Sequence, residues 1–283
     1  MYKIINGQSL AEKIKNNIAQ EIVKLGNARP NLAIILIGNR ADSKLYVSLK
    51  EKEAKKVGVD THLYKCDEDI SETEVLKIIK CLNKDELIDA ILVQLPLPNN
   101  LDVDAVIKAI DPLKDVDGFH PDNLRVLMSG CEHNESMPLI FSVILEILKS
   151  IKCDLTNKNV TVIANSNVFG NSLAQALDCH GAKTTVCHYN DKKLIDKTSF
   201  ADILVTAVGK KEFIKKNMVK QGAVVIDIGI TRRNGKIFGD VDFDDVKNKT
   251  SFITPVPGGV GPMTIAMAFK NTLDLYKKRH SVK

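Results

Sequence analysis

Short, mostly apolar runs recur along the chain, and they constrain its fold more than any other feature of the sequence. A run of this kind is typical of a β-strand that is buried on both faces. Strands that alternate with helices form largely parallel sheets with helices on both faces, so we expect an α/β protein. The runs lie at residues 32–38, 90–95, 160–164, 203–208 and 223–228.

Helical patterns fill the intervals between these runs. Ser9 with Glu12, and Ser71 with Glu74, predict capping boxes that open helices to about Leu25 and Leu82. The region from 111 to 134 is polar and rich in turn residues. Further helices are predicted at about 43–56, 138–151, 172–179 and 264–278, and further strands at 61–66 and 183–188.

Composition excludes several classes of protein. The chain has 283 residues, of which 44% are hydrophobic and 27% charged, and it can bury one large core or two moderate ones. The net charge of +5 comes from lysines scattered among acids, so we expect no nucleic-acid partner. With no membrane-length apolar run and no signal core, a cytoplasmic protein with no membrane partner is expected. The six cysteines form no Cys-x-x-Cys pair, which predicts reduced, mostly buried thiols and no metal site.

The strand at 160–164 leads through a tight turn into a helix. Backbone N–H groups at such a helix start can hold a pyrophosphate. The glycine pattern is poor, because Ala164 stands where a first glycine belongs and Gly170 alone remains. An ordinary strand-turn-helix is therefore an equal alternative, although Gly209 and Gly229 after later strands favour a ligand at this sheet edge.

Candidate chemical groups cluster in the first half of the chain. Tyr46 and Lys50 lie one helical turn apart, and a buried lysine there would have a lowered pKa and could exchange protons. Gln94 ends an apolar strand, and Asp117 lies in a turn before Gly118. The competing interpretations are a solvated surface lysine, a glutamine that caps local backbone, and a solvated Asx turn.

The loop at 254–264 contains three prolines and three glycines. Such a loop is stiff and can approach a ligand closely, and Pro262 suits a first helical position. A purely structural loop is the alternative.

Several of these segments occur together in one family. The segments at 43–50, 91–98, 114–121, 239–243 and 254–264 resemble, in order, the signatures of bifunctional methylenetetrahydrofolate dehydrogenase/cyclohydrolases. The resemblance runs from about Ile5 to Lys278 and places the chain in one-carbon metabolism. It implies oxidation of methylenetetrahydrofolate to methenyltetrahydrofolate with NADP, and hydrolysis of the product to formyltetrahydrofolate.

The resemblance also implies roles for single residues. Lys50 would transfer the proton, Gln94 would keep Lys50 neutral, Tyr46 would line the folate, and Asp117 would bind the pterin ring. Together with these, Leu95 and the loop residues Pro257, Gly258 and Gly259 would contact the substrate. The expected cofactor-binding residues are Ala164, Asn165, Ser166, Phe169, Gly170, Val208, Gly209 and Ile230.

The cofactor side departs from the family pattern. Asn165 and Asn171 stand where arginines are usual, and Tyr189 replaces a serine near the NADP phosphate. Asp191 adds a negative charge that suits NAD, and Ile140 replaces a threonine near the nicotinamide. We therefore expect NADP as cofactor, with NAD as an alternative and with reduced selectivity between them. A paralogue with an impaired cofactor site, active only as a cyclohydrolase or only in folate binding, is the competing hypothesis.

The full expectation is two three-layer α/β domains with a cleft between them. Residues 1–137, with the C-terminal helix at 264–283, would form a folate-binding catalytic domain. Residues 138–263 would form a Rossmann-like NAD(P)-binding domain. The expected partners are a small folate substrate and, by the resemblance, a second copy in a homodimer.

Overall fold

The computed structural model describes residues 2–26, 28–131 and 137–281. The chain divides into two compact units, and each has its own parallel sheet. One unit contains Met1–Ala11 and Val126–Thr264, and the other contains Glu12–Arg125 and Ile265–Lys283. We call them the six-stranded unit and the three-stranded unit. The division falls within helices α1 (Gly7–Lys24) and α10 (Val260–Arg279), so both helices contribute to both units.

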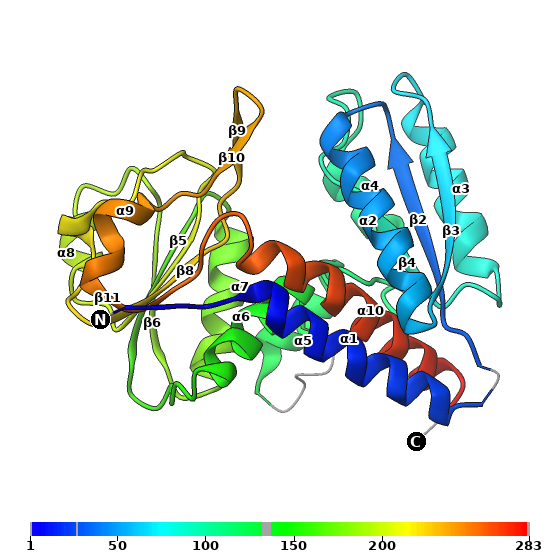
Figure 1. The fold of residues 1–283 in the computed structure, drawn as a ribbon. Helices are drawn as coiled ribbons and strands as arrows, with labels where there is room; N and C mark the ends of the chain where they lie inside the picture. Colours follow the sequence, from blue (N-terminus) through cyan, green and yellow to red (C-terminus); the bar gives the residue numbers. More distant parts are fainter. Residues whose placement is uncertain (1, 27, 132–136, 282–283) are drawn as a thin grey trace. The chain divides into compact units, whose positions relative to one another are not determined.

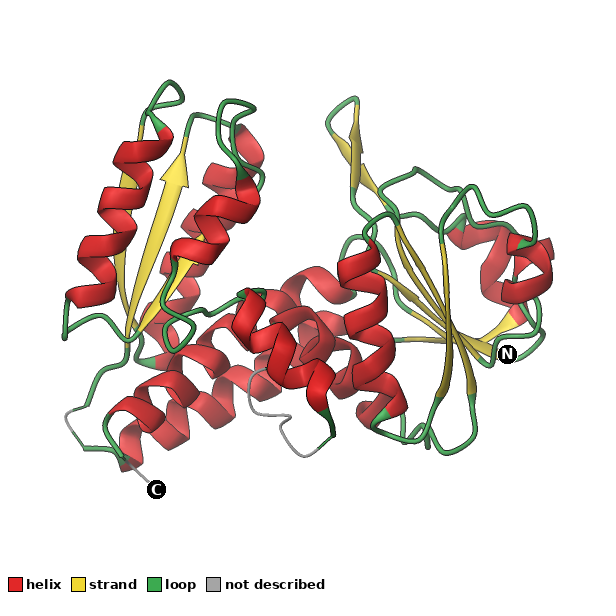
Figure 2. Cartoon of the chain, turned by 180° about the vertical axis from the view of Figure 1, so that it is seen from behind, coloured by secondary structure: helices red, strands yellow, loops and turns green. Residues whose placement is uncertain are grey.

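The six-stranded unit is a doubly wound sheet. Its strands lie in the order β1-β11-β8-β7-β5-β6, and all of the pairs are parallel. Helices α6 and α7 lie on one side of this sheet, and α8 and α9 lie on the other (Figures 1 and 2). The strands are β1 (Lys3–Ile4), β5 (Asn159–Ala164), β6 (Lys183–Cys187), β7 (Ile203–Ala207), β8 (Ala223–Asp227) and β11 (Thr250–Ile253).

The remaining elements of this unit connect the strands. A two-stranded hairpin, β9 (Thr231–Arg233) and β10 (Lys236–Phe238), follows β8 and projects from the sheet (Figure 1). The helices are α6 (Leu139–Ser150), α7 (Asn167–Asp178), α8 (Leu194–Thr198) and α9 (Phe243–Val246), with short 3-10 turns at Lys216–Met218 and Lys247–Lys249.

The order of the strands fixes where a ligand can bind. From β5 the chain passes through α7 to β6 on one side, and then crosses back to β7 on the other side of β5. The connections therefore diverge at the carboxyl ends of β5 and β7. In open α/β sheets, ligands bind at such a switch point.

The three-stranded unit has the sheet order β3-β2-β4, also parallel. Successive side chains of a strand face opposite sides. Ala33, Ile35 and Ile37 of β2 pack with Val75 and Ile79 of α3. Helix α2 contacts β2 and β3. The elements are β2 (Asn31–Ile37), α2 (Ala41–Val57), β3 (Asp60–Cys66), α3 (Glu72–Lys84), β4 (Ala90–Val93) and α4 (Val103–Ala109), and α5 (Pro121–Ser129) crosses the division.

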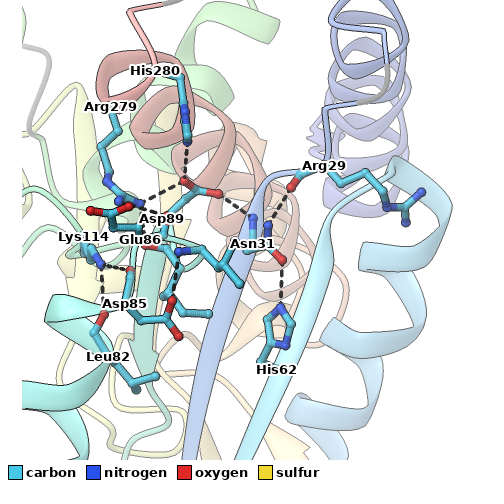
Figure 3. Close-up of polar contacts among 12 residues, drawn as sticks. Arg29, Asn31, His62, Leu82, Asp85, Glu86, Asp89, Lys114, Arg279 and His280 are labelled. Atoms are coloured by element: carbon cyan, nitrogen blue, oxygen red, sulfur yellow. Dashed lines mark hydrogen bonds and ion pairs between the residues drawn. The ribbon is translucent and has the colours of Figure 1, made fainter.

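A buried carboxylate anchors the end of α10 in the three-stranded unit (Figure 3). Asp89 is 1% exposed and accepts hydrogen bonds from the backbone N–H of Asn31 (2.8 Å) and from Arg279 (3.0 Å). His280 lies 3.1 Å from the same carboxylate. Nearby, the buried Lys114 ammonium donates to two carbonyl oxygens, and burial lowers its pKa. These contacts satisfy polar groups that would otherwise be costly to bury.

Most predicted strands and helices are present, with end points shifted by a few residues. The capping box at Ser71 and Glu74 is confirmed. The box predicted at Ser9 is wrong, because α1 begins at Gly7 and the Asn6 side chain accepts from the backbone N–H of Ser9. Pro262 is the third residue of α10, not the first. The stretch from 111 to 134 contains α5, and its residues 132–134 lie outside the described residues.

The predicted domain limits differ from the two compact units. Residues 2–11 and 126–131 belong with the six-stranded unit, because β1 pairs with β11 at the edge of that sheet. The functional assignment of each domain stays a prediction.

The expectation of reduced, mostly buried cysteines is wrong in two respects. Cys131 and Cys179 form a disulfide, although 48 positions separate them in the sequence. Among the four free cysteines of the described chain, Cys187 alone is buried. No short spacing motif marks this pair, because the fold brings the two residues together.

Candidate functional site

The three-stranded unit collects the predicted proton-transfer residues at the carboxyl end of its sheet. Lys50 is half-buried on α2, and its ammonium donates a 2.8 Å hydrogen bond to Gln94 Oε1. Gln94 follows the last residue of β4 and donates through Nε2 to the carbonyl oxygen of Leu95 at 2.7 Å. This second bond orients the amide so that its oxygen faces Lys50. Tyr46 lies one turn before Lys50 on α2 and is also half-buried.

Burial, rather than the surrounding charge, favours the neutral form of Lys50. Burial lowers the pKa of Lys50, and the nearby Asp117 carboxylate opposes this only in part. Gln94 carries no charge, so its hydrogen bond adds no ion pair that would hold the proton. A desolvated lysine with a neutral partner can accept a proton near neutral pH.

Asp117 is held beside this lysine by an extension of the sheet. A parallel bridge joins Ile91 of β4 to Asp115, which fixes the segment that leads to Asp117. Burial raises the pKa of Asp117 to about 6, while the charge of Lys50 lowers it and that of Asp115 raises it. The turn closes at Gly118, whose φ is 77°. Asp115 itself is buried and accepts from the backbone N–H of His120 at 2.7 Å, a structural role.

The loop residues Pro257, Gly258 and Gly259 belong to the six-stranded unit. The carbonyl oxygen of Gly258 accepts from the backbone N–H of Gly7 at 3.0 Å. A Cβ at Gly7 would lie 1.6 Å from the Gly259 carbonyl oxygen, so this approach requires glycine. Gly258 has a φ of 102° and open space where a Cβ would point. The roles predicted for this loop stay predictions.

The predicted cofactor residues lie at the switch point of the six-stranded sheet. Ser166 caps α7 by accepting from the backbone N–H of Phe169 at 3.2 Å. The residues from 165 to 168 are exposed, so the start of this helix is open to a ligand. Gly170 packs against β6, because a Cβ there would lie 2.6 Å from Val186 Cγ1. At Gly209, with a φ of 66°, nothing lies within 4 Å of the place a Cβ would occupy.

The other predicted cofactor residues differ from one another in burial and in side-chain contacts. Ala164 is buried at the end of β5, and Ile230 is 47% exposed after β8. The Phe169 ring turns toward Phe141 of α6, with ring centroids 5.4 Å apart. The Asn165 side chain donates to the carbonyl oxygen of Val208 at 2.8 Å, which ties the ends of β5 and β7 together.

Two buried aspartates, for which the sequence predicted no role, hold the backbone at this sheet edge. Asp240 is 0% exposed and accepts from the backbone N–H groups of Val208 (2.7 Å) and Lys210 (2.8 Å), and from the Thr206 hydroxyl (2.9 Å). It therefore fixes the loop after β7. Glycine is required at 229 because a Cβ there would lie 2.0 Å from Asp240 Cγ.

Asp227, at the end of β8, lies beside Asp240. Its carboxylate accepts from the backbone N–H groups of Gly229, Asp240 and Val241 at 2.9–3.1 Å. Burial raises its pKa to about 7. The sequence signal was the pair of glycines at 229 and 239 near two acids, a pattern that suits carboxylates enclosed by backbone.

A cavity of about 370 Å³ lies at the opposite, amino-terminal edge of the same sheet. It is lined by residues that precede or begin strands, among them Lys158, Ile203 and Val224. It is therefore away from the switch point. Within the described part of the chain, no cluster of three or more His, Cys, Asp or Glu side chains could hold a metal ion. The same part contains no helix long and apolar enough to cross a bilayer.

Comparison with known proteins matches both halves of the chain to one family. Residues 5–117 match the tetrahydrofolate dehydrogenase/cyclohydrolase catalytic domain, and residues 140–280 match the NAD(P)-binding domain of the same family. The chain belongs to this family. The resemblance drawn from the sequence motifs is confirmed, as is the expectation of two α/β domains.

Relatives in the tetrahydrofolate dehydrogenase/cyclohydrolase family match the whole chain. The bifunctional protein FolD of Sulfurihydrogenibium sp. (strain YO3AOP1) is 47% identical, over 98% of both chains. The FolD methylenetetrahydrofolate dehydrogenase/cyclohydrolase structure from Campylobacter jejuni is 39% identical with a TM-score of 0.93, over 99% of this chain and 100% of that one. The Trypanosoma brucei FolD structure, complexed with NADP cofactor and inhibitor, is 32% identical with a TM-score of 0.92, over 98% of both.

Proposed function

We propose that this protein is a bifunctional enzyme that oxidises methylenetetrahydrofolate to methenyltetrahydrofolate with NADP and hydrolyses that product to formyltetrahydrofolate. The observation that carries the proposal is the half-buried Lys50 held by the neutral amide of Gln94. Family membership at 47% identity over nearly the full chain supports the same pair of reactions.

The hydrolysis follows from the state of Lys50. Water adds its oxygen to the cationic methenyl carbon, one carbon–nitrogen bond breaks, and one proton is released. Neutral Lys50 accepts this proton as the water attacks, because burial lowers its pKa and Gln94 supplies no compensating charge. A cationic substrate close to Lys50 would lower its pKa further. Asp117 supplies an acceptor for donor groups of the pterin ring.

The oxidation requires a dinucleotide at the switch point of the six-stranded sheet. NADP held there would supply the acceptor for the hydride that leaves the methylene carbon. The exposed start of α7 and the open space at Gly209 fit such a ligand, since both leave backbone accessible. The chain's own residues bind and orient the dinucleotide there, while Asp240 and Asn165 hold the surrounding loops.

Two parallel assays test the proposal. Purified protein should reduce NADP with methylenetetrahydrofolate and should hydrolyse methenyltetrahydrofolate without any dinucleotide. Lys50→Met should abolish hydrolysis while the protein stays folded, because methionine fills a similar volume but accepts no proton. Lys52→Met, at an exposed lysine two positions along α2, is the matched control and should hydrolyse normally.

Near-normal hydrolysis by Lys50→Met would contradict the assignment of Lys50. Hydrolysis without any dinucleotide reduction by the wild-type protein would contradict the oxidation and leave a cyclohydrolase.

We also propose that the protein acts in the cytoplasm as a homodimer. The family resemblance supports the dimer. Analytical ultracentrifugation of the full chain tests the dimer, and a single monomeric species at micromolar concentration would contradict it.

A further inference from the structure

Two adjacent lysines after β7 lie on two different aromatic rings. The Lys210 ammonium is 3.4 Å from the ring centroid of Tyr189, and the Lys211 ammonium is 3.7 Å from that of Phe238. Tyr189 is half-buried, and its ring packs edge-on against Phe213 with centroids 6.4 Å apart. Lys210 is therefore held at the end of β6, while Lys211 is turned toward the hairpin.

The end of β6 is the place where a Rossmann-type sheet reads the adenosine ribose. A residue just beyond the strand after the nucleotide-binding helix contacts either the free 2′-hydroxyl of NAD or the 2′-phosphate of NADP. Here that helix is α7 and the strand is β6, which ends at Cys187, two residues before Tyr189. The ring of Tyr189 offers no charge to a phosphate.

Two of the nearby polar side chains are engaged elsewhere. Asp191 is paired with Lys197 at 2.7 Å and accepts from the backbone N–H of Lys193 at 2.9 Å, so its charge is largely compensated. The side-chain amide of Asn165 donates a hydrogen bond to the carbonyl oxygen of Val208. The ammonium of the exposed Lys210 lies 3.4 Å from the ring centroid of Tyr189 and 5.9 Å from that of Phe213, and a cation–π contact positions a cation without neutralising it.

The backbone of Lys210 is fixed as well. Its N–H donates to the fully buried Asp240 at 2.8 Å, and Gly209 with its positive φ makes the turn that precedes it. The backbone of Lys210 therefore has a defined position, and its side chain extends along the Tyr189 ring to the end of β6.

We infer that Lys210, seated on the ring of Tyr189, binds the 2′-phosphate of NADP and sets the preference for NADP over NAD. The inference rests on the proposed function, because it names the group that discriminates between dinucleotides at the same switch point. Lys210 is a specificity residue, and Tyr189 is a positioning residue that acts through it.

Dissociation constants for NADP and NAD, measured by titration calorimetry on the full-length protein, test this inference. A charge-assisted hydrogen bond is worth ~1.5–3 kcal/mol, so Lys210→Met should weaken NADP binding ~10- to 100-fold. NAD binding should change less than ~3-fold, since NAD lacks the phosphate. Lys211→Met is the matched control and should change neither constant. Tyr189→Phe, which keeps the ring, should bind NADP normally, and Tyr189→Leu should not.

Equal weakening of NADP and NAD in Lys210→Met, or an unchanged ratio of the two constants, would overturn the inference. Loss of NADP preference in the double variant Lys192→Met/Lys193→Met, with Lys210→Met unaffected, would assign the role to the loop after β6 instead. Wild-type protein that binds neither dinucleotide would overturn the proposed oxidation as well, so the two failures are distinguishable.

Discussion

A lysine beside a neutral amide behaves differently from one beside a carboxylate. Gln94 keeps its oxygen toward Lys50 because its nitrogen is bonded to the Leu95 carbonyl. The lysine therefore has a defined position but no contact ion pair, and burial can lower its pKa. If the side-chain nitrogen of Gln94 were an oxygen, the resulting carboxylate would keep Lys50 charged, and Lys50 could not act as a proton acceptor.

Gln94→Glu should slow the hydrolysis at neutral pH and move its pH profile to higher pH. A carboxylate at this position stabilises the ammonium form, which raises the pKa of Lys50 and leaves less neutral amine at pH 7. The rate should recover as the pH rises through the new pKa. Initial rates of methenyltetrahydrofolate hydrolysis across pH check this. An unshifted profile with a lower plateau would show that Gln94 acts on geometry alone.

Asp117→Ala should weaken folate binding and leave dinucleotide binding nearly unchanged. Removing the acceptor leaves pterin donors unpaired, at a cost of ~1–3 kcal/mol. The measurement is titration of each ligand against the wild-type protein and the variant. Asp122→Ala, at a half-buried position at the start of α5, is a control that should change neither. Equal weakening of both ligands would count against the role.

At the scale of elements, helix-strand packing at α7 depends on one missing methyl group. A Cβ at Gly170 would lie 2.6 Å from Val186 Cγ1 on β6. The close approach brings the start of α7 against β6, the next strand in the sequence. The local geometry of the candidate cofactor site therefore depends on side-chain volume in the core.

Gly170→Ala should lower the free energy of unfolding by ~1–3 kcal/mol, because overpacking forces the helix away from the strand. In the double variant Gly170→Ala/Val186→Ala the clash with Cγ1 is gone, so the loss should be smaller than the sum of the single losses. Urea unfolding of all four proteins measures this. Simple additivity would show that the contact is not the cause.

Asp240→Asn should weaken dinucleotide binding while hydrolysis continues. Val208 and Lys210 donate to different oxygens of Asp240, and the amide replaces one of these oxygens with an NH₂ group. One backbone N–H therefore loses its partner at a cost of ~1–3 kcal/mol. The loop after β7 then loses its fixed conformation. Calorimetric titration of NADP, together with the hydrolysis assay, tests this. Asp244→Asn, at an exposed acid nearby, is the control. Parallel loss of both activities would indicate general unfolding.

The sequence predicted the elements that carry a strong local pattern. The strands at β2, β4, β5, β7 and β8 are apolar runs, and each is visible without any knowledge of its neighbours. Strand β1 has two residues and the hairpin strands have three, which is too short for a period to appear. Helix α5 was missed because it lies in a polar, turn-rich stretch.

The residues of the candidate site likewise divide into those that a local sequence pattern predicts and those that it does not. Lys50 and Tyr46 were found from helical spacing and Gln94 from its place at a strand end. The glycines at 229 and 239 are a local signal for Asp227 and Asp240, but this signal does not show that the carboxylates bind backbone 14 and 32 positions away in the sequence. The contact of Lys210 with Tyr189 also joins two different loops, so no local pattern in the sequence predicts it.

At the scale of the whole molecule, the stability of the protein depends on the last turn of α10 as well as on the core of the three-stranded unit. Arg279→Met should destabilise the protein by ~1–3 kcal/mol, because it removes a partner of the buried Asp89 carboxylate. Lys80→Met, at an exposed lysine of α3, should be neutral. Chemical unfolding measures both. Asp89→Asn/Arg279→Met should lose less than Arg279→Met alone, and a larger loss would contradict the electrostatic explanation.

The pairing of β1 with β11 has a consequence for the order in which the protein assembles during synthesis. Lys3 and Ile4 leave the ribosome about 250 residues before their partners Phe252 and Ile253. At ~5–20 residues per second, the N-terminal strand waits more than ten seconds for its place. The edge of the six-stranded sheet therefore closes only after β11 has been synthesised, and β1 becomes native later than segments whose partners lie nearby in the sequence.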